Sequence, residues 1–208
     1  MELIQLPEPE LSSETSIEQA IASRVSRRSF AAEPVALADV GQLLWAAQGI
    51  THERNGIAMR TAPSAGATYP LTIFLEIQPD GCEQLSAGIY RYSPRTHTLE
   101  LAVDAAVRDD LAQAAFTQNV IRDAPATIVV TAEFERTLRE YPRHGERYVH
   151  MEAGHVAENV HLSCESRGLN SCPVGAFDDD QVCDALSLPA ELDPLYLLPF
   201  GKRETSVE

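Results

Sequence analysis

The sequence predicts an α+β fold in which a sheet is flanked by helices. Apolar segments typical of strands, such as LTIFLEI (71–77) and PLYLLPFG (194–201), interleave with segments of helical periodicity. They do so without the regular strand–helix–strand spacing of a doubly wound nucleotide fold. The 208 residues, of which 44% are hydrophobic, are enough for one domain with a full core, and a second domain is not required.

The N-terminus is predicted to be an extended arm followed by a helix. Residues 1–14 contain two prolines and form the arm, and residues 15–208 form the folded domain. Thr15 and Glu18 have the spacing of a capping box. The segment IEQAIASR (17–24) then carries helical periodicity, so we expect a helix there.

A second helix and a long loop are expected next. The segment ALADVGQLLWAAQG (36–49) follows Pro34, and Gly49 is a natural stop for a helix. The following stretch, 51–70, is polar and rich in small residues, so we interpret it as a long loop, and such loops are usually functional. One face of the predicted helix carries Val40, Leu43, Leu44 and Ala47.

The middle of the chain is predicted to supply most of the sheet. A buried strand is expected over 71–77, and a hairpin over 88–102 with SPRTH as its turn. Residues 104–118 have a helical pattern, and Pro125 separates them from a strand over 126–134.

The C-terminal part is predicted to contain one long helix and one short helix before the last strand. The long helix begins near Arg147 and runs to about Arg167, with Gly168 near its end. The loop SCPVGAF (171–177) follows, then a short helix over 179–188. The last strand, 194–201, precedes a short charged tail.

Composition excludes several kinds of partner. The net charge is −15, from 31 acidic and 16 basic residues, which opposes binding to nucleic acid or anionic lipid. No apolar run approaches the ~20 residues of a membrane span, and no signal peptide is apparent, so a cytoplasmic location is expected. The four cysteines contain no C-x-x-C pair and are interpreted as reduced thiols.

The most informative string is SRVSRRSF (23–30). Arginine offers a planar fork of donors that suits a phosphate or the pyrimidine edge of a reduced flavin. Arg24, Ser26 and Arg28 alternate, so in an extended segment they would point the same way. The alternative is a solvated basic patch at a helix end, where arginine favours the helix dipole.

Two loops rich in small residues are further candidates. In APSAGATYP (62–70), small residues would let the backbone approach a flat ligand, and two prolines stiffen the chain. Backbone N–H groups around Gly175, in CPVGAF, could donate to a ring nitrogen. Taken alone, APSAGATYP lacks a dinucleotide-binding Gly-x-Gly-x-x-Gly pattern and is better interpreted as a plain connector, and CPVGAF is only a turn.

The long helix contains two E-x-x-H pairs, Glu152 with His155 and Glu158 with His161. Di-iron proteins use this spacing but place the pairs on separate helices. Both pairs here lie on one helix, six residues apart, and are rotated away from each other. Packing, capping or a subunit contact is therefore the preferred interpretation. The motifs of hydrolases, kinases and zinc proteases are also absent from the sequence.

Taken in order, the motifs resemble the nitroreductase-like flavoproteins, and within them the branch of SagB/ThcOx-type dehydrogenases. The resemblance extends from about Ser23 to Lys202. It implies an α+β sandwich with a central antiparallel or mixed sheet flanked by helices, and an intertwined homodimer with FMN at each of two interfacial sites. It depends on RVSRRSF, LLWAAQGI, R-x-x-PSAGATYP, GIYRYSP, ERYVHMEAGHVAENV, GLNSCPVGAFDDDQV and LYLLPFG.

The same resemblance implies roles for individual residues. The segment from Arg24 through Val25 and Ser26 to Arg28 matches the R-x-S-x-R element that holds FMN, with the first arginine at the phosphate and the last at the pyrimidine edge. There a positive charge stabilises the anionic reduced flavin. Matching loops against the flavin are Pro63, Ser64, Ala65 and Gly66, typically from the partner subunit, and Pro173, Val174, Gly175 and Ala176 near flavin N5. Lys202 and Arg203 match a basic phosphate contact.

One departure from the family concerns Tyr141. Members that oxidise azoline rings in peptides commonly carry a lysine–tyrosine pair before the R-Y-x-x-x-E-x-G-H helix, and here the matching pair is Glu140–Tyr141. Tyr141 can still serve as an acid or base, so it is the one catalytic side chain that we predict. The missing lysine weakens the prediction of azoline oxidation.

The sequence therefore predicts an FMN-dependent oxidoreductase with ping-pong chemistry. NADH, NADPH or another donor would reduce FMN at N5, and a small organic molecule would be the second substrate. Two alternatives stay open: an azoline dehydrogenase of a peptide-modifying system, and a non-catalytic flavin-binding or structural partner. No metal is expected.

Overall fold

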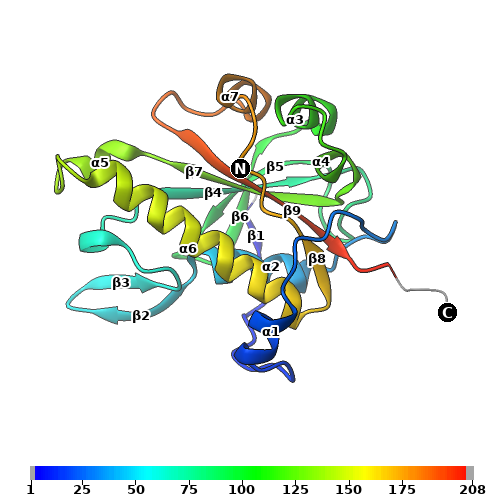
Figure 1. Ribbon diagram of the computed structural model, residues 1–208, viewed down its shortest axis with the longest axis horizontal. Helices are drawn as coiled ribbons and strands as arrows, with labels where there is room; N and C mark the ends of the chain where they lie inside the picture. The colour runs from blue at the N-terminus through cyan, green and yellow to red at the C-terminus, as the bar shows by residue number, and fades with distance from the viewer. Residues whose placement is uncertain (1–2, 205–208) are drawn as a thin grey trace.

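The computed structural model describes residues 3–204, and residues 1–2 of the arm and 205–208 of the tail lie outside this range. Seven strands form one sheet in the order β1-β6-β5-β4-β7-β9-β8, and every neighbouring pair is antiparallel. Helices flank this sheet (Figure 1), so the α+β prediction is confirmed. The strands are β1 (Leu3–Gln5), β4 (Leu71–Ile77), β5 (Gly88–Ser93), β6 (Thr98–Val103), β7 (Ala126–Ala132), β8 (Leu169–Ser171) and β9 (Asp193–Lys202).

Two hydrophobic cores lie on opposite faces of the sheet. Because side chains alternate along a strand, Ile73 and Leu75 of β4 enter one core while Phe74 enters the other. The first core is covered by α2 (Leu37–Gln48) and α6 (Gly145–Ser166). The second is covered by α3 (Arg108–Ala114), α4 (Asn119–Asp123) and α7 (Asp179–Leu186), which gather at the top of Figure 1.

Several elements lie where the sequence predicts them. The strand over 71–77 has the predicted bounds, and the 88–102 hairpin is formed by β5 and β6. Helix α6 begins two residues before Arg147, and Gly168 follows its end with a φ of +67°. Gly49 caps α2, whose four predicted apolar residues, Val40, Leu43, Leu44 and Ala47, are all fully buried.

Two predictions in the first 70 residues are wrong. The capping box of α1 (Ile17–Ser23) is formed by Ser16 and Gln19, one residue later than predicted. The first half of the expected loop 51–70 is a hairpin of β2 (Ile50–Arg54) and β3 (Ile57–Arg60). Its turn is Asn55-Gly56, with φ values of +53° and +77°, and this dipeptide is a strong hairpin signal that the polar composition obscured.

The middle of the chain is more broken than predicted. The helix expected over 104–118 is limited to α3, because Phe116 and Thr117 have φ values of +56° and +58° that end it. Helix α4 then precedes β7, which stops at Ala132. Helix α5 (Phe134–Leu138) occupies the end of the predicted strand and packs against α6.

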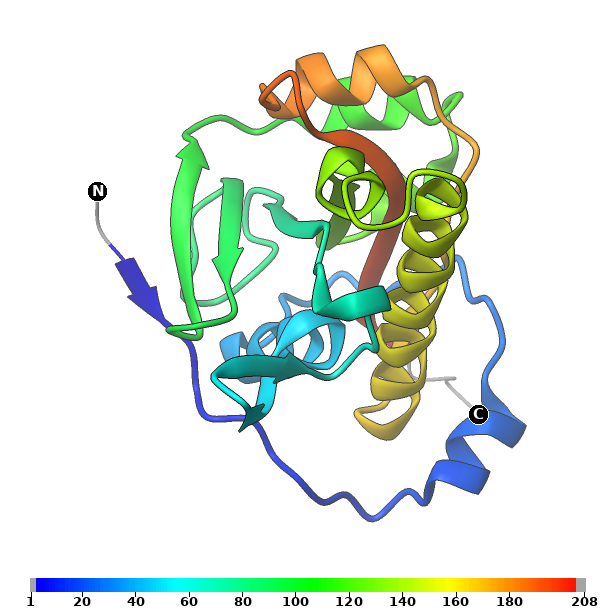
Figure 2. The same ribbon diagram turned by 90° about the vertical axis from the view of Figure 1, so that its left-hand side faces the viewer.

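The N-terminal arm runs from one edge of the sheet to α6. Strand β1 pairs with β6 at the sheet edge. From there the chain passes below α2 to α1, beside the C-terminal end of α6 (Figure 2). This path brings SRVSRRSF (23–30), the arginine-rich segment at the end of α1, next to the last turns of α6 and to β8 and β9.

Candidate cofactor-binding site

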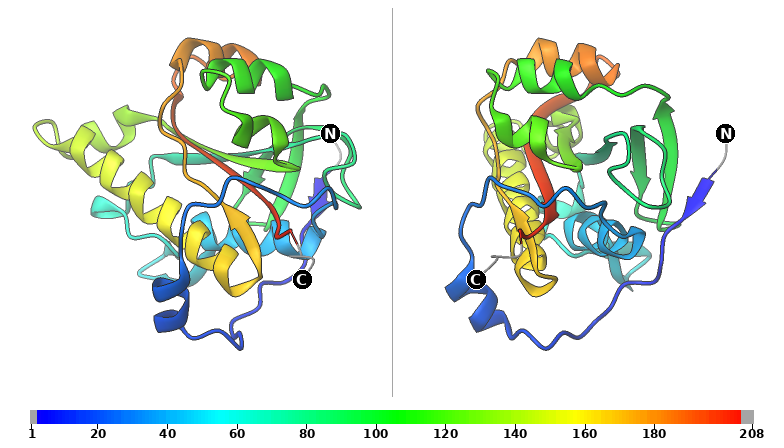
Figure 3. Two further views of the ribbon diagram at one scale, coloured as in Figure 1. Left: turned by 45° about the vertical axis from the view of Figure 1, so that its right-hand side comes forward. Right: turned by 90° about the vertical axis from the view of Figure 1, so that its right-hand side faces the viewer.

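The arginine-rich segment leaves α1 in an extended conformation and runs beside β8 and β9 (Figure 3). The backbone N–H of Arg27 donates to the carbonyl oxygen of Ser171 at 3.0 Å. Asn170 Nδ2 donates to the Ser29 carbonyl oxygen at 2.8 Å. The segment is therefore tied to β8 by its backbone, which leaves its side chains free for other contacts.

The predicted ligands in this segment are accessible. Arg24 is half-buried, and its Nε lies 3.8 Å from Oε1 of Glu158 on α6. Ser26 and Arg28 are exposed, and within residues 3–204 their side chains make no hydrogen bond or ion pair. Their donors are thus available to an anionic ligand.

Val25 also contacts α6. Val25 is 50% exposed, and its carbonyl oxygen lies 3.3 Å from Nε2 of buried His161. A carbonyl oxygen can only accept, so the ring must carry its proton on Nε2. Burial lowers the pKa of His161, more than the Val25 carbonyl raises it. His161 is therefore a neutral donor that fixes the segment.

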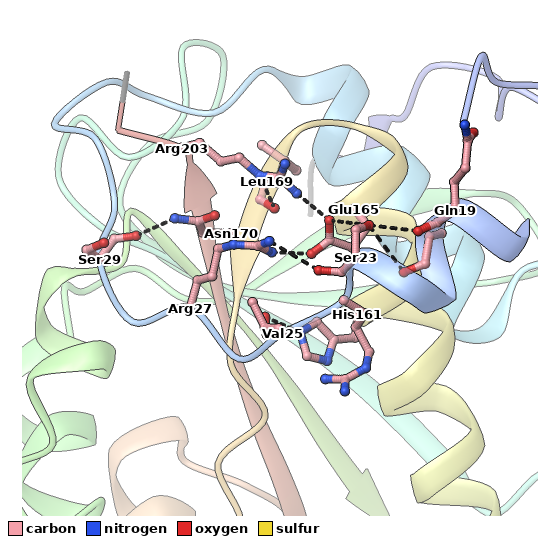
Figure 4. Close-up of polar contacts among 12 residues, drawn as sticks. Gln19, Ser23, Val25, Arg27, Ser29, His161, Glu165, Leu169, Asn170 and Arg203 are labelled. Carbon is pink, nitrogen blue, oxygen red and sulfur yellow. Dashed lines mark hydrogen bonds and ion pairs between the residues drawn. The ribbon is translucent and has the colours of Figure 1, made fainter. Parts of the chain in front are cut away.

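Glu165 of α6 connects the segment to the end of β9 (Figure 4). Its carboxylate accepts from Arg27, from Arg203 Nη2 at 2.7 Å and from the Ser23 hydroxyl at 3.1 Å. Burial raises the pKa of Glu165, but the arginines outweigh burial and the net pKa is lowered. Neither Arg27 nor Glu165 was predicted as a site residue from the sequence, and Glu165 belongs to no recognised motif.

The two basic residues near the C-terminus are already paired. Lys202 Nζ lies 3.2 Å from Oε2 of Glu33. Besides its contact with Glu165, Arg203 donates from Nε to the Leu169 carbonyl oxygen at 3.3 Å. Both residues lie beside the arginine-rich segment as expected for one site, but their charges are directed to carboxylates of this chain.

The second predicted group lies near the N-terminal end of α6. Pro63 and Gly66 are exposed, and Ser64 and Ala65 are half-buried. Gly66 has a φ of +59°, and a Cβ placed there would lie 2.8 Å from the hydroxyl of Tyr141. Tyr141, the predicted catalytic residue, therefore packs directly on this loop, and its ring also stacks edge-on with Tyr148.

Beneath the same loop lies a polar cluster that was not predicted from the sequence, in which Gln48 and Glu152 are buried and Arg60 is half-buried. Arg60 Nη1 donates to Gln48 Oε1 at 2.5 Å. Within the described residues, neither Gln48 Nε2 nor Glu152 Oε1 has a hydrogen-bond partner. Burial raises the pKa of Glu152, and Ser64 and Gln48 lower it by less. Arg60 belongs to the motif R-x-x-PSAGATYP and Glu152 to ERYVHMEAGHVAENV, and these family motifs were the only sequence signal for the cluster.

The third predicted group, 173–176, follows β8. Val174 pairs in both directions with Leu197 of β9, at 2.8 and 2.9 Å, so its N–H is already used. The Ala176 carbonyl accepts from Gln118 Nε2 at 3.0 Å. Pro173 is half-buried, whereas Gly175 and Ala176 are exposed, so the accessible backbone of this loop is at Gly175–Ala176.

The structure thus places the predicted ligands in two separate groups and not in one site. The arginine-rich segment and residues 202–203 meet around Glu165, while residues 63–66 and Tyr141 lie near the other end of α6. Across the part of the chain that the structure describes, no hydrogen bond or ion pair joins these two groups. A cavity of about 820 Å³ between the arm, α1, α2 and α6 contains none of the predicted ligands.

The E-x-x-H pairs do not assemble a metal centre. Glu152 and His161 are buried, while His155 and Glu158 are exposed. In residues 3–204, no three His, Cys, Asp or Glu side chains are placed to hold a metal ion. Over the same range, no helix has the length and apolar character needed to cross a membrane.

The protein is an α+β fold in which an antiparallel sheet lies between two helical layers, with an arginine-rich segment along the sheet edge. Residues 21–202 match the nitroreductase family, and the chain belongs to that family. It is 40% identical to the nitroreductase-like protein MJ1384 of Methanocaldococcus jannaschii over 201 residues, which is 96% of each chain. The crystal structure of a nitroreductase-like protein from Ralstonia eutropha JMP134 matches with a TM-score of 0.82 and 29% identity, covering 98% of this chain and 90% of that one.

Similarity also extends to the microcin B17-processing protein McbC of Escherichia coli. The identity is 27% over 150 residues, which is 70% of this chain and 55% of McbC. The structure of the microcin synthetase McbBCD complex matches with a TM-score of 0.74 at 24% identity, over 96% of this chain and 78% of that one, and shows the shared fold. The predicted family is confirmed, and the sequence similarity to McbC supports its SagB/ThcOx-type branch.

Proposed function

We propose that this protein is an FMN-dependent oxidoreductase that acts as an intertwined homodimer. Its membership of the nitroreductase family supports the class of reaction. The observation that carries the cofactor assignment is that segment 24–28 is hydrogen-bonded to β8 and exposes Ser26 and Arg28, whose side chains have no hydrogen-bond or ion-pair partner within residues 3–204. When bound, FMN would supply two-electron redox chemistry, and the protein supplies orientation and charge.

The residues present fit an anionic, planar cofactor. Arg24 and Arg28 provide charge and forked donors for a phosphate and a pyrimidine edge. Pro63, Gly66 and Gly175–Ala176 are exposed and lie beside small side chains, which allows close approach of a flat ring. Lys202 and Arg203 would have to exchange their carboxylate partners to contact a phosphate.

A homodimer is proposed because one chain holds the candidate ligands in separate groups. The arginine-rich segment and the Pro63–Gly66 loop make no mutual hydrogen bond or ion pair within residues 3–204. A second copy that brings its own Pro63–Gly66 loop to the arginine-rich segment would complete each site. Sedimentation should therefore give a dimer.

The first test is the absorbance spectrum of the purified protein, followed by anaerobic titration with NADH and NADPH. We expect flavin bands that bleach with one of these donors, as ping-pong chemistry with a small organic substrate requires. Bands that resist both donors would indicate a dehydrogenase reduced by its own substrate. A colourless protein that refuses FMN would contradict the proposal and favour a structural role.

Arg28→Ala tests the assignment of Arg28 to the pyrimidine edge of the flavin. Loss of the positive charge should weaken FMN binding and lower the flavin reduction potential, because the anionic reduced form loses its stabilising charge. Arg91→Ala is the matched control, since Arg91 is an exposed arginine on β5. Unchanged affinity and potential in Arg28→Ala would show that this role is wrong.

A second candidate, an azoline dehydrogenase of a peptide-modifying system, is favoured by the similarity to McbC. Tyr141, packed on Gly66 beside the predicted flavin loop, would act there as acid or base. The test is aromatisation of an azoline peptide, alone or with partner proteins, in the wild-type protein and in Tyr141→Phe. Glu140 occupies the position of the usual lysine. If the wild-type protein does not aromatise the peptide, alone or with partner proteins, this candidate is removed.

A further inference from the structure

We propose that Glu165 is a positioning residue for the flavin site, and that Arg27 and Arg203 serve it and do not bind the cofactor. The Glu165 carboxylate would hold the arginine-rich segment and the end of β9 in one arrangement. The inference rests on the proposed FMN site, because it concerns how that site is kept in shape.

The geometry is that of a buried carboxylate shared by two distant parts of the chain. Only 3% of the Glu165 side chain is exposed. Oε1 accepts from Arg27, and Oε2 accepts from Arg203 Nη2 at 2.7 Å and from the Ser23 hydroxyl at 3.1 Å. The donors therefore come from both ends of the described chain and meet on the last turns of α6 (Figure 4).

This arrangement determines where the neighbouring side chains point. Successive side chains of an extended segment project to opposite sides. Because Arg27 is turned inward to Glu165, its neighbours Ser26 and Arg28 are turned outward, and both are exposed. Without the carboxylate, the Arg27 side chain would lose its inward partner and the register of the segment would be free to change.

The charge of Glu165 matters as well as its shape. A glutamine would retain one acceptor oxygen and place an amide N–H₂ group, which can only donate, against one of the guanidinium groups. Arg27 and Arg203 have side-chain exposures of 29% and 37%, so both can turn to solvent when the carboxylate is lost. Their release would disorder the segment without removing any FMN ligand.

A double-mutant cycle tests the inference. FMN and riboflavin dissociation constants are measured by flavin fluorescence for the wild-type protein, Glu165→Gln, Arg203→Ala and the double variant. Loss of a charged hydrogen bond typically weakens an interaction about tenfold or more. We expect both single variants to weaken FMN and riboflavin binding by similar factors, and the double variant to bind no more weakly than either.

Glu158→Gln is the matched control, because Glu158 lies on the same helix and pairs with Arg24 only at 3.8 Å. We expect it to bind FMN within about twofold of the wild-type protein, as is usual for an exposed pair. Hydrogen exchange in the flavin-free protein gives a second readout. Glu165→Gln should speed exchange at the Arg27 amide, which donates to Ser171, more than in the middle of α6.

The outcomes separate the two proposals. If the wild-type protein binds no flavin, the proposed function is wrong and the inference has no site to act on. If Glu165→Gln binds flavin as well as Glu158→Gln does, the inference is wrong and the FMN site stands. A loss in Arg203→Ala that is specific to FMN and persists in the Glu165→Gln background would make Arg203 a direct phosphate ligand and also overturn it.

Discussion

Glu76 and Glu165 are both buried carboxylates, but their surroundings give their pKa values opposite shifts. Glu76, on β4, is 0% exposed, and its hydrogen-bond partner is the amide of Gln78. Burial raises its pKa to about 8. Glu165, on α6, contacts two arginines, which more than offset burial and lower its pKa. The pKa of a buried carboxyl is thus lowered where arginines contact it directly and raised where its contact is a neutral amide.

The largest expected effect is at Glu76. Because its pKa is raised from 4.5, its contribution to stability is complete below pH 4.5 and is lost as the pH rises to about 8. The unfolding free energy of the wild-type protein should therefore fall, relative to Glu76→Gln, by about 3 kcal/mol between pH 5 and 8. Urea denaturation at the two pH values measures this difference.

Glu53→Gln provides the control for that comparison. Glu53 is exposed on β2, so its replacement should change stability by under about 0.5 kcal/mol at either pH. If the difference in unfolding free energy between the wild-type protein and Glu76→Gln stays constant from pH 5 to 8, then burial does not raise the pKa of Glu76, and the explanation is wrong.

The next largest effect is at Glu165, whose contribution to stability depends on pH in the opposite direction from that of Glu76. Glu165→Gln should lower the unfolding free energy at pH 7 by about 2 kcal/mol, less than for a fully buried pair because both arginines are partly exposed. The pKa of Glu165 is lowered, so its contribution is present above 4.5 and is lost as the pH falls through the folded-state pKa. The deficit of Glu165→Gln should therefore shrink in acid, as chemical denaturation can measure.

The two sites also show what the sequence could predict. The sheet, α2, α6 and the order of the family motifs were predictable because hydrophobic periodicity and motif spacing are local. Glu165 was not, because its partners lie 138 and 38 residues away, and only the folded chain brings them together. Glu76 sits in the apolar run LTIFLEI, where sequence alone predicts burial but not which partner its carboxyl will have.

A smaller effect is expected where Tyr141, which precedes α6, packs on Gly66. Gly66→Ala should cost about 1–2 kcal/mol, because alanine is strained at a φ of +59° and its Cβ would lie 2.8 Å from the Tyr141 hydroxyl. Tyr141→Phe removes that oxygen and should recover part of the loss. Thermal denaturation of both single variants and the double variant checks this, and strictly additive effects would contradict the contact.

The smallest effect, and the sharpest test of the comparison, is at Glu152. It lies on the same helix as Glu165 and is also buried, but its pKa is raised because burial exceeds the influence of Ser64, Gln48, Arg60 and Arg136. Its contribution is therefore lost as the pH rises above 4.5, and Glu152→Gln should gain up to about 1 kcal/mol at pH 8. Urea denaturation of Glu152→Gln and Glu165→Gln at pH 5 and 8 should give changes of opposite sign at pH 8. A loss of stability in both variants would mean that Arg60 compensates Glu152 as directly as Arg27 and Arg203 compensate Glu165, and that direct contact with a cation is not what separates them.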